Sequence, residues 1–400
     1  MTKIQFDGLH YETGSVHNIL ALQGIQMPHT KSAPSEALLL GLSGGITFGY
    51  FSFAYKGLDP HVALLTRNTF DPLEKLLDRL SIVRTVKQTT DASKAEKNLF
   101  DALDNGQPVL VWADQISLPY NTYDGMLGDE MYMMMPVVVF GHDSKKGTVD
   151  IADQSRKPMK IDASILTRAR ARVKKEKFRQ MTLTLPSFDK LAQGVASALH
   201  ASIQSFYTSP IKGYATNFGF AAYQRWADAL INDKDKQSWN KIFPAGRFMF
   251  AGLASAFERI ELFGTGGASS RPLFGDFLDE ASLLLGKPAL RESAAQVRAL
   301  APLWTALGKA LLPDDMPLFK ETRQLMLKKR DLFWEKGDGA TNEIKNIHIR
   351  LKAIRKIMEK DFPLSDSEVL ALKQNLREHI LQIHDAEKKA ITELEKAFLL

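Results

Sequence analysis

The sequence predicts an α+β protein with a mixed N-terminal domain, residues 1–180, and an all-helical domain, residues 187–400. In the first part, continuous apolar runs alternate with amphipathic segments, which is typical of a sheet covered on both faces. After Pro186 helical periodicity dominates, and we find no convincing strand up to the C-terminus. At 400 residues the chain is long enough for two domains of ordinary size.

The N-terminal part begins with a predicted helix over residues 8–22, in which Val16, Ile19 and Leu20 follow a three-and-four spacing. Thr13 or Ser15 can cap its N-terminus with a side-chain oxygen. Capping, proline and turn signals then predict a helix near 35–40, a strand at 46–55, a helix at 71–80, a strand at 81–86, a helix from Asp91 to about Leu103, a buried strand at 108–113, a loop at 115–130, and a hairpin of strands 136–141 and 148–152 with its turn at 143–147.

The C-terminal part reads as a series of helices separated by Pro, Gly, Asn or Asp. The predicted helices cover residues 188–204, 215–232, 245–263, 274–285, 291–312, 316–334, 342–360 and 365–398. The last two carry alternating charges, and we expect them to form a long antiparallel hairpin that faces solvent.

Composition excludes several classes of protein. The chain has no cysteine, which rules out disulfides, thiolate metal sites and cysteine catalysis. The first residues lack the apolar core of a signal peptide, so we expect a cytoplasmic protein. The uncharged run 37–55 approaches the length of a membrane span, but its glycines favour a buried helix, turn and strand. No membrane partner is therefore expected.

The net charge of +6 is unevenly distributed and is densest in residues 168–179. Such a basic run suits an acidic partner, and an acidic carrier protein is one candidate. A solvated helix face or loop explains the run equally simply. The run has little aromatic interleaving and no accompanying nucleic-acid motif, so nucleic acid is not the expected partner. The candidate docking residues are Arg168, Arg170, Arg172, Lys174 and Lys175.

Two groups of polar residues are candidates for chemistry. His10, Tyr11 and His17 lie at or near the N-terminus of the first predicted helix, where the helix dipole favours negative charge. Asp114, Tyr120 and Asp153 lie at or beyond the ends of predicted strands, where a site is expected in such a sheet.

The glycine-rich segment 41–45 matches the G-x-S-x-G pattern of serine hydrolases. A nucleophile elbow needs a strand before the serine and a helix after it, whereas here the predicted order is reversed. Gly44 and Gly45 are better explained by a tight turn in which backbones approach closely.

Three further features have ordinary structural explanations. Turn chemistry accounts for Asp143 and favours an exposed turn position for His142. The loop carboxylates Asp124, Asp129 and Glu130 lack the spacing of a metal site, so no metal is predicted. In the glycine-rich segment 264–281, Arg271 precedes a helix and could bind an anion in a bidentate manner, or it could tie this loop to a neighbouring helix.

The residues together resemble the butirosin-biosynthesis acyltransferase family, followed by the helical domain of unknown function that usually accompanies it. The resemblance covers nearly the whole chain. It rests on His10-Tyr-Glu-Thr-Gly14 with Asn18-Ile-Leu20, Ser35-Glu-Ala37 with the segment 41–50, Val109-Leu-Val-Trp-Ala-Asp114 with Leu118-Pro-Tyr120, Val137-Val-Val-Phe-Gly-His-Asp143 with Asp153, and Gly264-Thr-Gly-Gly267 with Arg271, Phe274, Phe277, Glu280 and Trp304.

This resemblance implies a papain-like first domain, similar to the bacteriocin-processing cysteine peptidases. It also implies transfer of an aminoacyl group from an acyl carrier protein to the amine of an aminoglycoside, through a Cys-His-Asp arrangement. The sequence departs from that arrangement, because Tyr11 stands where the cysteine is expected and Met135 lies near the place of the histidine. Only Asp153 remains at the third position.

A phenol has a pKa of about 10 and supplies little anion at neutral pH, so a covalent mechanism is not expected. The first hypothesis is therefore a pseudoenzyme of natural-product biosynthesis that binds a small amine or acyl ligand, or an acyl carrier protein, without a cofactor. Binding would involve Met135, Tyr120, Gly44, Gly45 and Arg271. A homodimer is compatible with this hypothesis.

The alternative is an acyltransferase that holds thioester and amine together without a covalent step. His10, His17 or Asp114 would then handle the proton. Convergence of these three side chains in an open pocket would favour the alternative. A closed pocket filled by Tyr11 and Met135 would argue against any substrate there.

Overall fold

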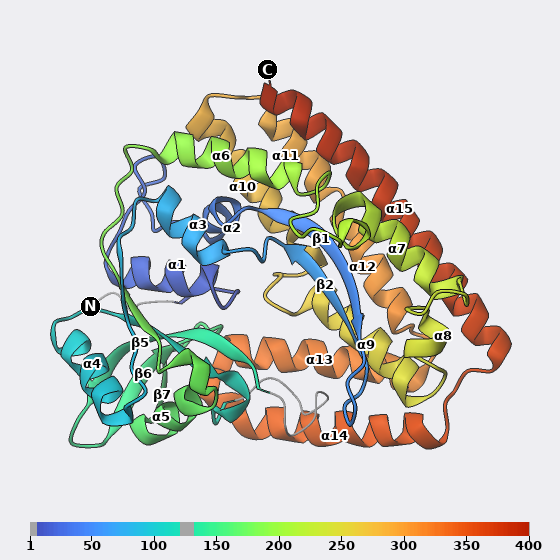
Figure 1. Ribbon diagram of the computed structural model, residues 1–400, viewed down its shortest axis with the longest axis horizontal. Helices are drawn as coiled ribbons and strands as arrows, with labels where there is room; N and C mark the ends of the chain where they lie inside the picture. The colour runs from blue at the N-terminus through green and yellow to red at the C-terminus, as the bar shows by residue number, and fades with distance from the viewer. Residues whose placement is uncertain (1–5, 121–131, 400) are drawn as a thin grey trace.

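The N-terminal region combines helices with antiparallel sheets, and an all-helical region ending in long helices follows it (Figure 1). The computed structural model describes residues 6–120 and 132–399. The N-terminal elements are α1 (Thr13–Leu22), α2 (Glu36–Leu42), β1 (Ile46–Phe53), β2 (His61–Arg67), α3 (Pro72–Arg79), β3 (Arg84–Lys87), α4 (Ala92–Asp104), β4 (Val109–Asp114), η1 (Gln115–Ser117), β5 (Met134–Asp143), β6 (Thr148–Ala152), β7 (Met159–Asp162), α5 (Ala163–Ala171), η3 (Lys174–Glu176) and β8 (Gln180–Leu183).

The helical region follows β8 without a further strand in its described part. Its elements are α6 (Leu191–Gln204), η4 (Ala215–Asn217), α7 (Gly219–Ile231), α8 (Trp239–Ile242), α9 (Arg247–Glu261), η5 (Ala268–Ser270), α10 (Arg271–Leu285), α11 (Leu290–Arg298), α12 (Ala301–Leu311), α13 (Pro317–Lys336), η6 (Gly337–Ala340), α14 (Thr341–Lys360) and α15 (Asp366–Leu399). No helix in residues 6–120 and 132–399 is long and apolar enough to cross a membrane.

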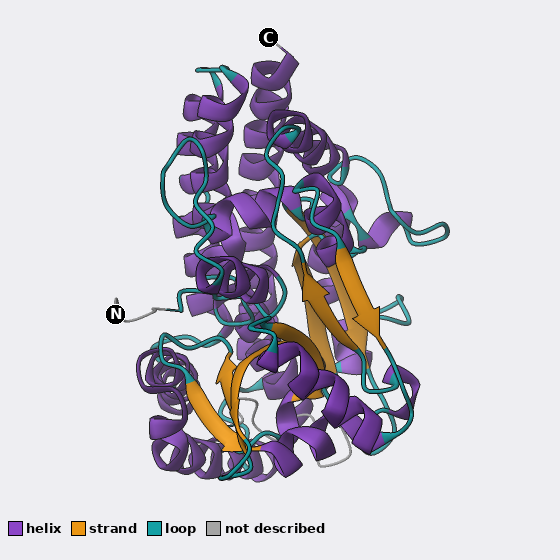
Figure 2. Cartoon of the chain, turned by 90° about the vertical axis from the view of Figure 1, so that its left-hand side faces the viewer, coloured by secondary structure: helices purple, strands orange, loops and turns teal. Residues whose placement is uncertain are grey.

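The larger sheet has six antiparallel strands in the order β3-β8-β4-β5-β6-β7, and β1 and β2 form a separate two-stranded ribbon (Figure 2). Alternate residues of the larger sheet enter two different cores, because successive side chains of a strand point to opposite faces. Leu110 and Val138 join the main core, whereas Val109 and Val111 join a second core with residues of α4 and α5. The predicted covering of the sheet on both faces is confirmed.

The start signal of α4 is confirmed, because Asp91 accepts a hydrogen bond from the backbone N–H of Lys94. In α1 the predicted apolar residues Val16, Ile19 and Leu20 are buried, but the predicted cap by Thr13 or Ser15 is wrong: both lie inside the helix, and its N-cap residue Glu12 makes no side-chain capping bond. Gly44 and Gly45 have φ angles of 110° and 67° and form the turn between α2 and β1. The order helix, turn, strand is therefore the reverse of a nucleophile elbow, as predicted.

Two predictions about the helices are wrong. Residues 291–312 form two helices, because Pro302 near the start of α12 lacks the N–H needed to continue α11. The last two helices do not pack as an antiparallel hairpin: α14 lies against α13 and α9, and α15 lies against α7, α11 and α12. Figure 1 shows them diverging from the turn that joins them, because each covers a different part of the molecule.

Five helices and strands of the described residues were not predicted, namely β2, β7, β8, α5 and α8. The strands β7 and β8 have only four residues each, too few to establish an alternating pattern. The basic residues at the end of α5 masked its buried face, which contains Leu166 and Ala169.

The ribbon of β1 and β2 is fixed inside the helical region by a buried ion pair. Arg271, at the start of α10, donates from Nε to Glu387 Oε1 of α15 at 2.7 Å, and both side chains are fully buried. The same guanidinium donates to the carbonyl oxygens of Thr47 at 3.1 Å and Thr66 at 2.9 Å, on β1 and β2. The main core accordingly contains residues from both parts of the chain.

Replacing Arg271 with methionine should lower the free energy of unfolding by about 3–5 kcal/mol, because Glu387 would stay buried without a counter-ion. Urea denaturation measures this loss. The double variant Arg271→Met/Glu387→Leu should lose clearly less, since it leaves no buried charge. Arg298→Met, which breaks a surface pair with Asp276, is the control and should cost less than about 1 kcal/mol. Equal losses for Arg271→Met and Arg298→Met would contradict this assignment.

Candidate functional site

The backbone before α1 is held by one buried carboxylate. Glu36 of α2 accepts hydrogen bonds from the N–H groups of Leu9 at 2.5 Å and His10 at 3.0 Å. It also accepts from the Thr13 hydroxyl at 2.8 Å. These bonds satisfy backbone donors of the segment before α1 and so hold the entry to the helix in place.

A second contact joins this segment to the loop after α9. Arg67 of β2 donates to Thr13 Oγ1 and to the carbonyl oxygen of Gly264, both at 3.1 Å. Gly264 has a φ of 64°, and a Cβ there would lie 2.5 Å from Cδ2 of His10. The glycine-rich segment after α9 and the N-terminal stretch therefore form one structural unit.

His10 is buried in this unit, and its environment favours the neutral ring. Its Nδ1 accepts a hydrogen bond from the Glu12 backbone N–H at 3.2 Å. Burial lowers the pKa of His10 well below its ordinary value, and the neighbouring Arg67 lowers it further.

Tyr11 lies beside His10 with 3.9 Å between the ring centroids, and 5.9 Å from the ring of Phe263. Burial raises the pKa of the Tyr11 phenol far above its ordinary value, and the neighbouring carboxylate of Glu12 adds to this effect. Arg67 and Arg259 oppose the shift without cancelling it. The phenol therefore stays protonated at neutral pH and cannot act as an anionic nucleophile.

Asp153, beyond the end of β6, is paired with a tyrosine. Tyr120 donates its hydroxyl to Asp153 Oδ2 at 3.3 Å, and the Gln154 N–H donates to Oδ1 at 2.8 Å. Burial raises the pKa of Asp153 above its ordinary value. Met135, at the expected histidine position, is half-buried on β5 opposite Ala113 of β4.

The three residues considered as proton carriers have separate partners. His17 Nδ1 lies 2.7 Å from the carbonyl oxygen of Pro34. Asp114 accepts from the Ser117 hydroxyl at 2.5 Å and from the Met133 N–H at 2.8 Å. None of the contacts in residues 6–120 and 132–399 joins these two groups to each other or to His10.

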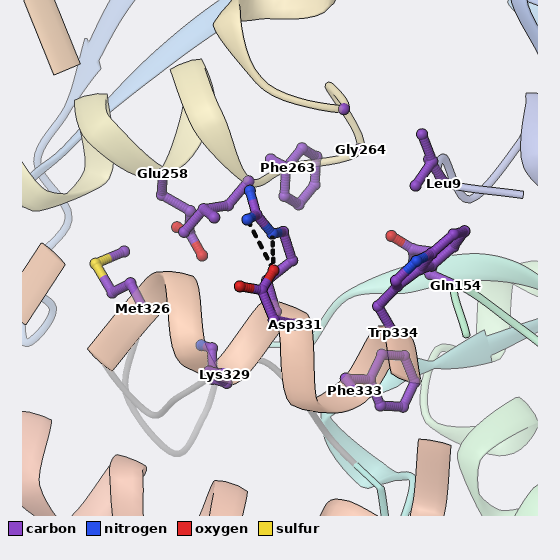
Figure 3. Close-up of a pocket in the computed structure, with 13 residues that line it drawn as sticks. Leu9, Gln154, Glu258, Phe263, Gly264, Met326, Lys329, Asp331, Phe333 and Trp334 are labelled. Carbon is purple, nitrogen blue, oxygen red and sulfur yellow. Dashed lines mark hydrogen bonds and ion pairs between the residues drawn. The ribbon is translucent and has the colours of Figure 1, made fainter. Parts of the chain in front are cut away.

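A pocket of about 340 Å³ opens beside the positions of the expected triad (Figure 3). Leu9, Gln154 and Phe333 line it, and they adjoin His10, Asp153 and the Tyr120 ring respectively. Tyr11 and Met135 are not among its lining residues. Most of the pocket wall comes from α9, the loop after it and α13, through Glu258, Leu262, Phe263, Gly264, Gly266, Met326, Lys329, Arg330, Asp331 and Trp334.

The sequence analysis did not identify these wall residues, because they lie far along the chain from the expected triad. One signal was available. Lys329 follows Met326 by three residues and precedes Phe333 by four, so it interrupts the apolar stripe of α13. All three side chains line the pocket.

The basic run divides between the interior and the surface. Arg170 is buried and donates to the carbonyl oxygen of Phe178 at 2.7 Å and to Gln180 Oε1 at 3.2 Å, and burial lowers its pKa to about 10. Arg168 and Arg172 line a separate hollow of about 470 Å³ with Asp114, and Lys174 and Lys175 are exposed.

The remaining candidates have roles in the protein's own structure. Arg271 forms the buried ion pair with Glu387 described above, and Gly44 and Gly45 form the turn before β1. His142 Nε2 lies 2.7 Å from Asp104 Oδ1, and Asp143 accepts from two N–H groups of its turn. The described residues contain no group of three or more His, Asp or Glu side chains that could hold a metal ion. Asp124, Asp129 and Glu130 lie outside the described residues.

Comparison with family models identifies both parts of the chain. Residues 10–154 match the model described as butirosin biosynthesis protein H, N-terminal. Residues 165–316 match the model described as a domain of unknown function (DUF4872). A search of curated proteins gives no match.

Gly264→Ala should destabilise the protein more than Gly286→Ala. Both glycines have a φ of 64°, but only at Gly264 does a Cβ meet another group, Cδ2 of His10 at 2.5 Å. Gly286→Ala measures the backbone cost, about 1–2 kcal/mol, and the overpacking at Gly264 should add about 1–3 kcal/mol in urea denaturation. Adding His10→Ala to Gly264→Ala should recover part of this extra loss. Equal losses for the two glycine variants would show that the contact contributes nothing.

Glu12 should make the protein less stable as the pH rises. Burial raises its pKa from 4.5 to about 7, Arg67 opposes the shift and Glu74 adds to it. Its contribution to stability is thus fully present below the unfolded pKa of about 4.5 and is lost as the pH rises through about 7. His10 has a lowered pKa and acts in the opposite direction, so its contribution to stability is present above a pH of about 6.5.

The opposite pH effects of Glu12 and His10 overlap in the wild type. The effect of Glu12 is therefore isolated by comparing the melting temperatures of Glu12→Gln and the wild type at each pH. The melting temperature of Glu12→Gln minus that of the wild type should increase between pH 5.5 and 8 and then level off. The exposed Glu378→Gln should give a difference that does not vary over this range. A flat difference for Glu12→Gln would contradict the raised pKa.

Proposed function

We propose that this chain, whose residues 10–154 match the model of butirosin biosynthesis protein H, N-terminal, and whose residues 165–316 match DUF4872, is a pseudoenzyme that binds a small molecule non-covalently. The ligand site is the pocket between the start of α1, the turn after β6, α9 and α13. The N-terminal domain is in this view a papain-like domain that has lost its catalytic groups. The role belongs to natural-product biosynthesis, in line with the description of the matching family.

One observation carries the proposal: the expected nucleophile position holds a phenol whose surroundings keep it protonated. The pKa of Tyr11 is raised by burial, and the adjacent His10 ring has a lowered pKa and accepts a hydrogen bond from the backbone. A general base must hold or reach the proton that it removes, and the described contacts of His10 supply no such bond to the Tyr11 hydroxyl. The carboxylate of Asp153 is bound by Tyr120 and orients no histidine.

The pocket itself supports binding. Its volume of about 340 Å³ lies within the range of small-molecule sites, and its walls combine aromatic rings with a few polar groups. Since Tyr11 and Met135 do not fill it, loss of the nucleophile leaves this space open. An amine or acyl ligand is the class that the resemblance to the butirosin-biosynthesis acyltransferase family implies.

An acyl carrier protein is the macromolecular partner that we propose for delivery of an acyl ligand. Its acidic surface would meet the exposed cations Arg168, Arg172, Lys174 and Lys175. Arg170 takes no part in this surface, because its guanidinium is used inside the protein.

The test combines a binding and a turnover measurement on the full chain. Acyl-pantetheine thioesters, acyl carrier protein thioesters and aminoglycoside amines are each titrated by calorimetry, and amide formation is followed by mass spectrometry. We expect binding of at least one ligand class and no amide above the uncatalysed rate, with Tyr11→Phe unchanged. Amide formation that is lost in His10→Ala would instead establish the non-covalent acyltransferase. Absence of binding in every titration would refute the ligand-binding role.

A further inference from the structure

We propose that Lys329 forms an anion subsite in this pocket, so that the ligand carries a carboxylate or phosphate group beside an apolar portion. The inference rests on the proposed ligand-binding role and adds the chemical class of the ligand. Lys329 lies on α13 and lines the pocket at the end where Figure 3 also shows Glu258 and Met326.

Lys329 is buried without a partner. The residue is 6% exposed, and no hydrogen bond or ion pair joins its side chain to another group in the structure described here. The other buried lysine of this part of the chain, Lys373, donates to the side-chain oxygen of Asn240. Lys329 is thus the exception between the two buried lysines of the described residues.

Asp331 of the pocket wall does not pair with Lys329. It is engaged by its neighbour Arg330, with 2.7 Å between Nη2 and Oδ1, and Figure 3 shows this pair. Glu258 lines the same end of the pocket. The Lys329 amine is not among the fully buried nitrogen and oxygen atoms that lack a partner in the described residues, so it stays open to the pocket.

The position of Lys329 in α13 shows what packing alone would prefer. The residue lies on the apolar stripe between Met326 and Phe333, where a leucine or methionine would match the apolar neighbours. A ligand anion within reach of the amine would pair with its charge, and charge-assisted hydrogen bonds are among the stronger polar contacts. The charge is therefore best explained by something that enters the pocket.

The apolar part of the ligand follows from the remaining walls. Leu262, Phe263, Phe333 and Trp334 present aliphatic and aromatic surface to the same space. An aromatic acid or an aromatic phosphate matches both parts, because the ring would pack on these walls while the anion meets Lys329.

The probes are benzoate, phenyl phosphate and the uncharged benzyl alcohol, titrated into the full chain at constant ionic strength. We expect at least one anion to bind ten times more tightly than benzyl alcohol, and the comparison of the two anions decides between carboxylate and phosphate. Lys329→Met should remove this preference, because a methionine carries no charge to meet the anion. Lys328→Met, the exposed neighbour on α13, is the matched control and should behave as the wild type.

Two results would overturn the subsite. One is a wild-type protein that binds neither anion more tightly than benzyl alcohol, a measurement that needs no variant. The other is an anion preference that persists in Lys329→Met or disappears equally in Lys328→Met. If Lys329→Met does not fold, Lys329→Gln takes its place. The two proposals can fail independently. If wild type and Lys329→Met bind an acyl or amine ligand equally tightly, only the anion subsite is refuted. If the protein binds an anion but no acyl or amine ligand, only the ligand class expected from the family is refuted.

Discussion

The buried pair of Arg271 and Glu387 determines how the two parts of this protein fit together. Neither side chain reaches solvent, and the guanidinium also holds carbonyl oxygens of β1 and β2. A buried charge tolerates few arrangements, since each unsatisfied donor costs free energy. The ribbon of β1 and β2, the start of α10 and the middle of α15 must therefore assemble together, and the helical region completes the core of the N-terminal region.

This arrangement places the loop after α9 on the N-terminal stretch and so creates the pocket. Gly264 fits against His10 because it has no side chain, and Arg67 binds the Gly264 carbonyl from β2. The pocket lies between segments that are about 250 residues apart in sequence, Leu9 on one side and Phe263 with Gly264 on the other. The helical domain thus supplies most of the site, and the expected triad only borders it.

Local signals predicted most elements, because caps, prolines and apolar spacing act within a few residues. The start of α4 at Asp91 and the glycine turn at Gly44 and Gly45 are examples. The packing of α14 and α15 could not be read in the same way, since their amphipathic faces do not specify which partner they cover. At the site, Tyr11 was assigned to the expected cysteine position only through the family resemblance, and Lys329 was overlooked although it interrupts an apolar stripe.

A phenol at the expected cysteine position is compatible with an intact fold, because other groups hold the entry to α1. The carboxylate of Glu36 binds this entry through backbone donors and Thr13, none of which depends on the side chain at position 11. A phenol can therefore occupy the expected cysteine position without disturbing α1. Lys329 differs, because no hydrogen bond or ion pair of the described residues ties it to the fold and its charge interrupts the apolar stripe of α13. A charged residue at this place, on the wall of a pocket that borders the expected triad, argues for a site that takes a ligand.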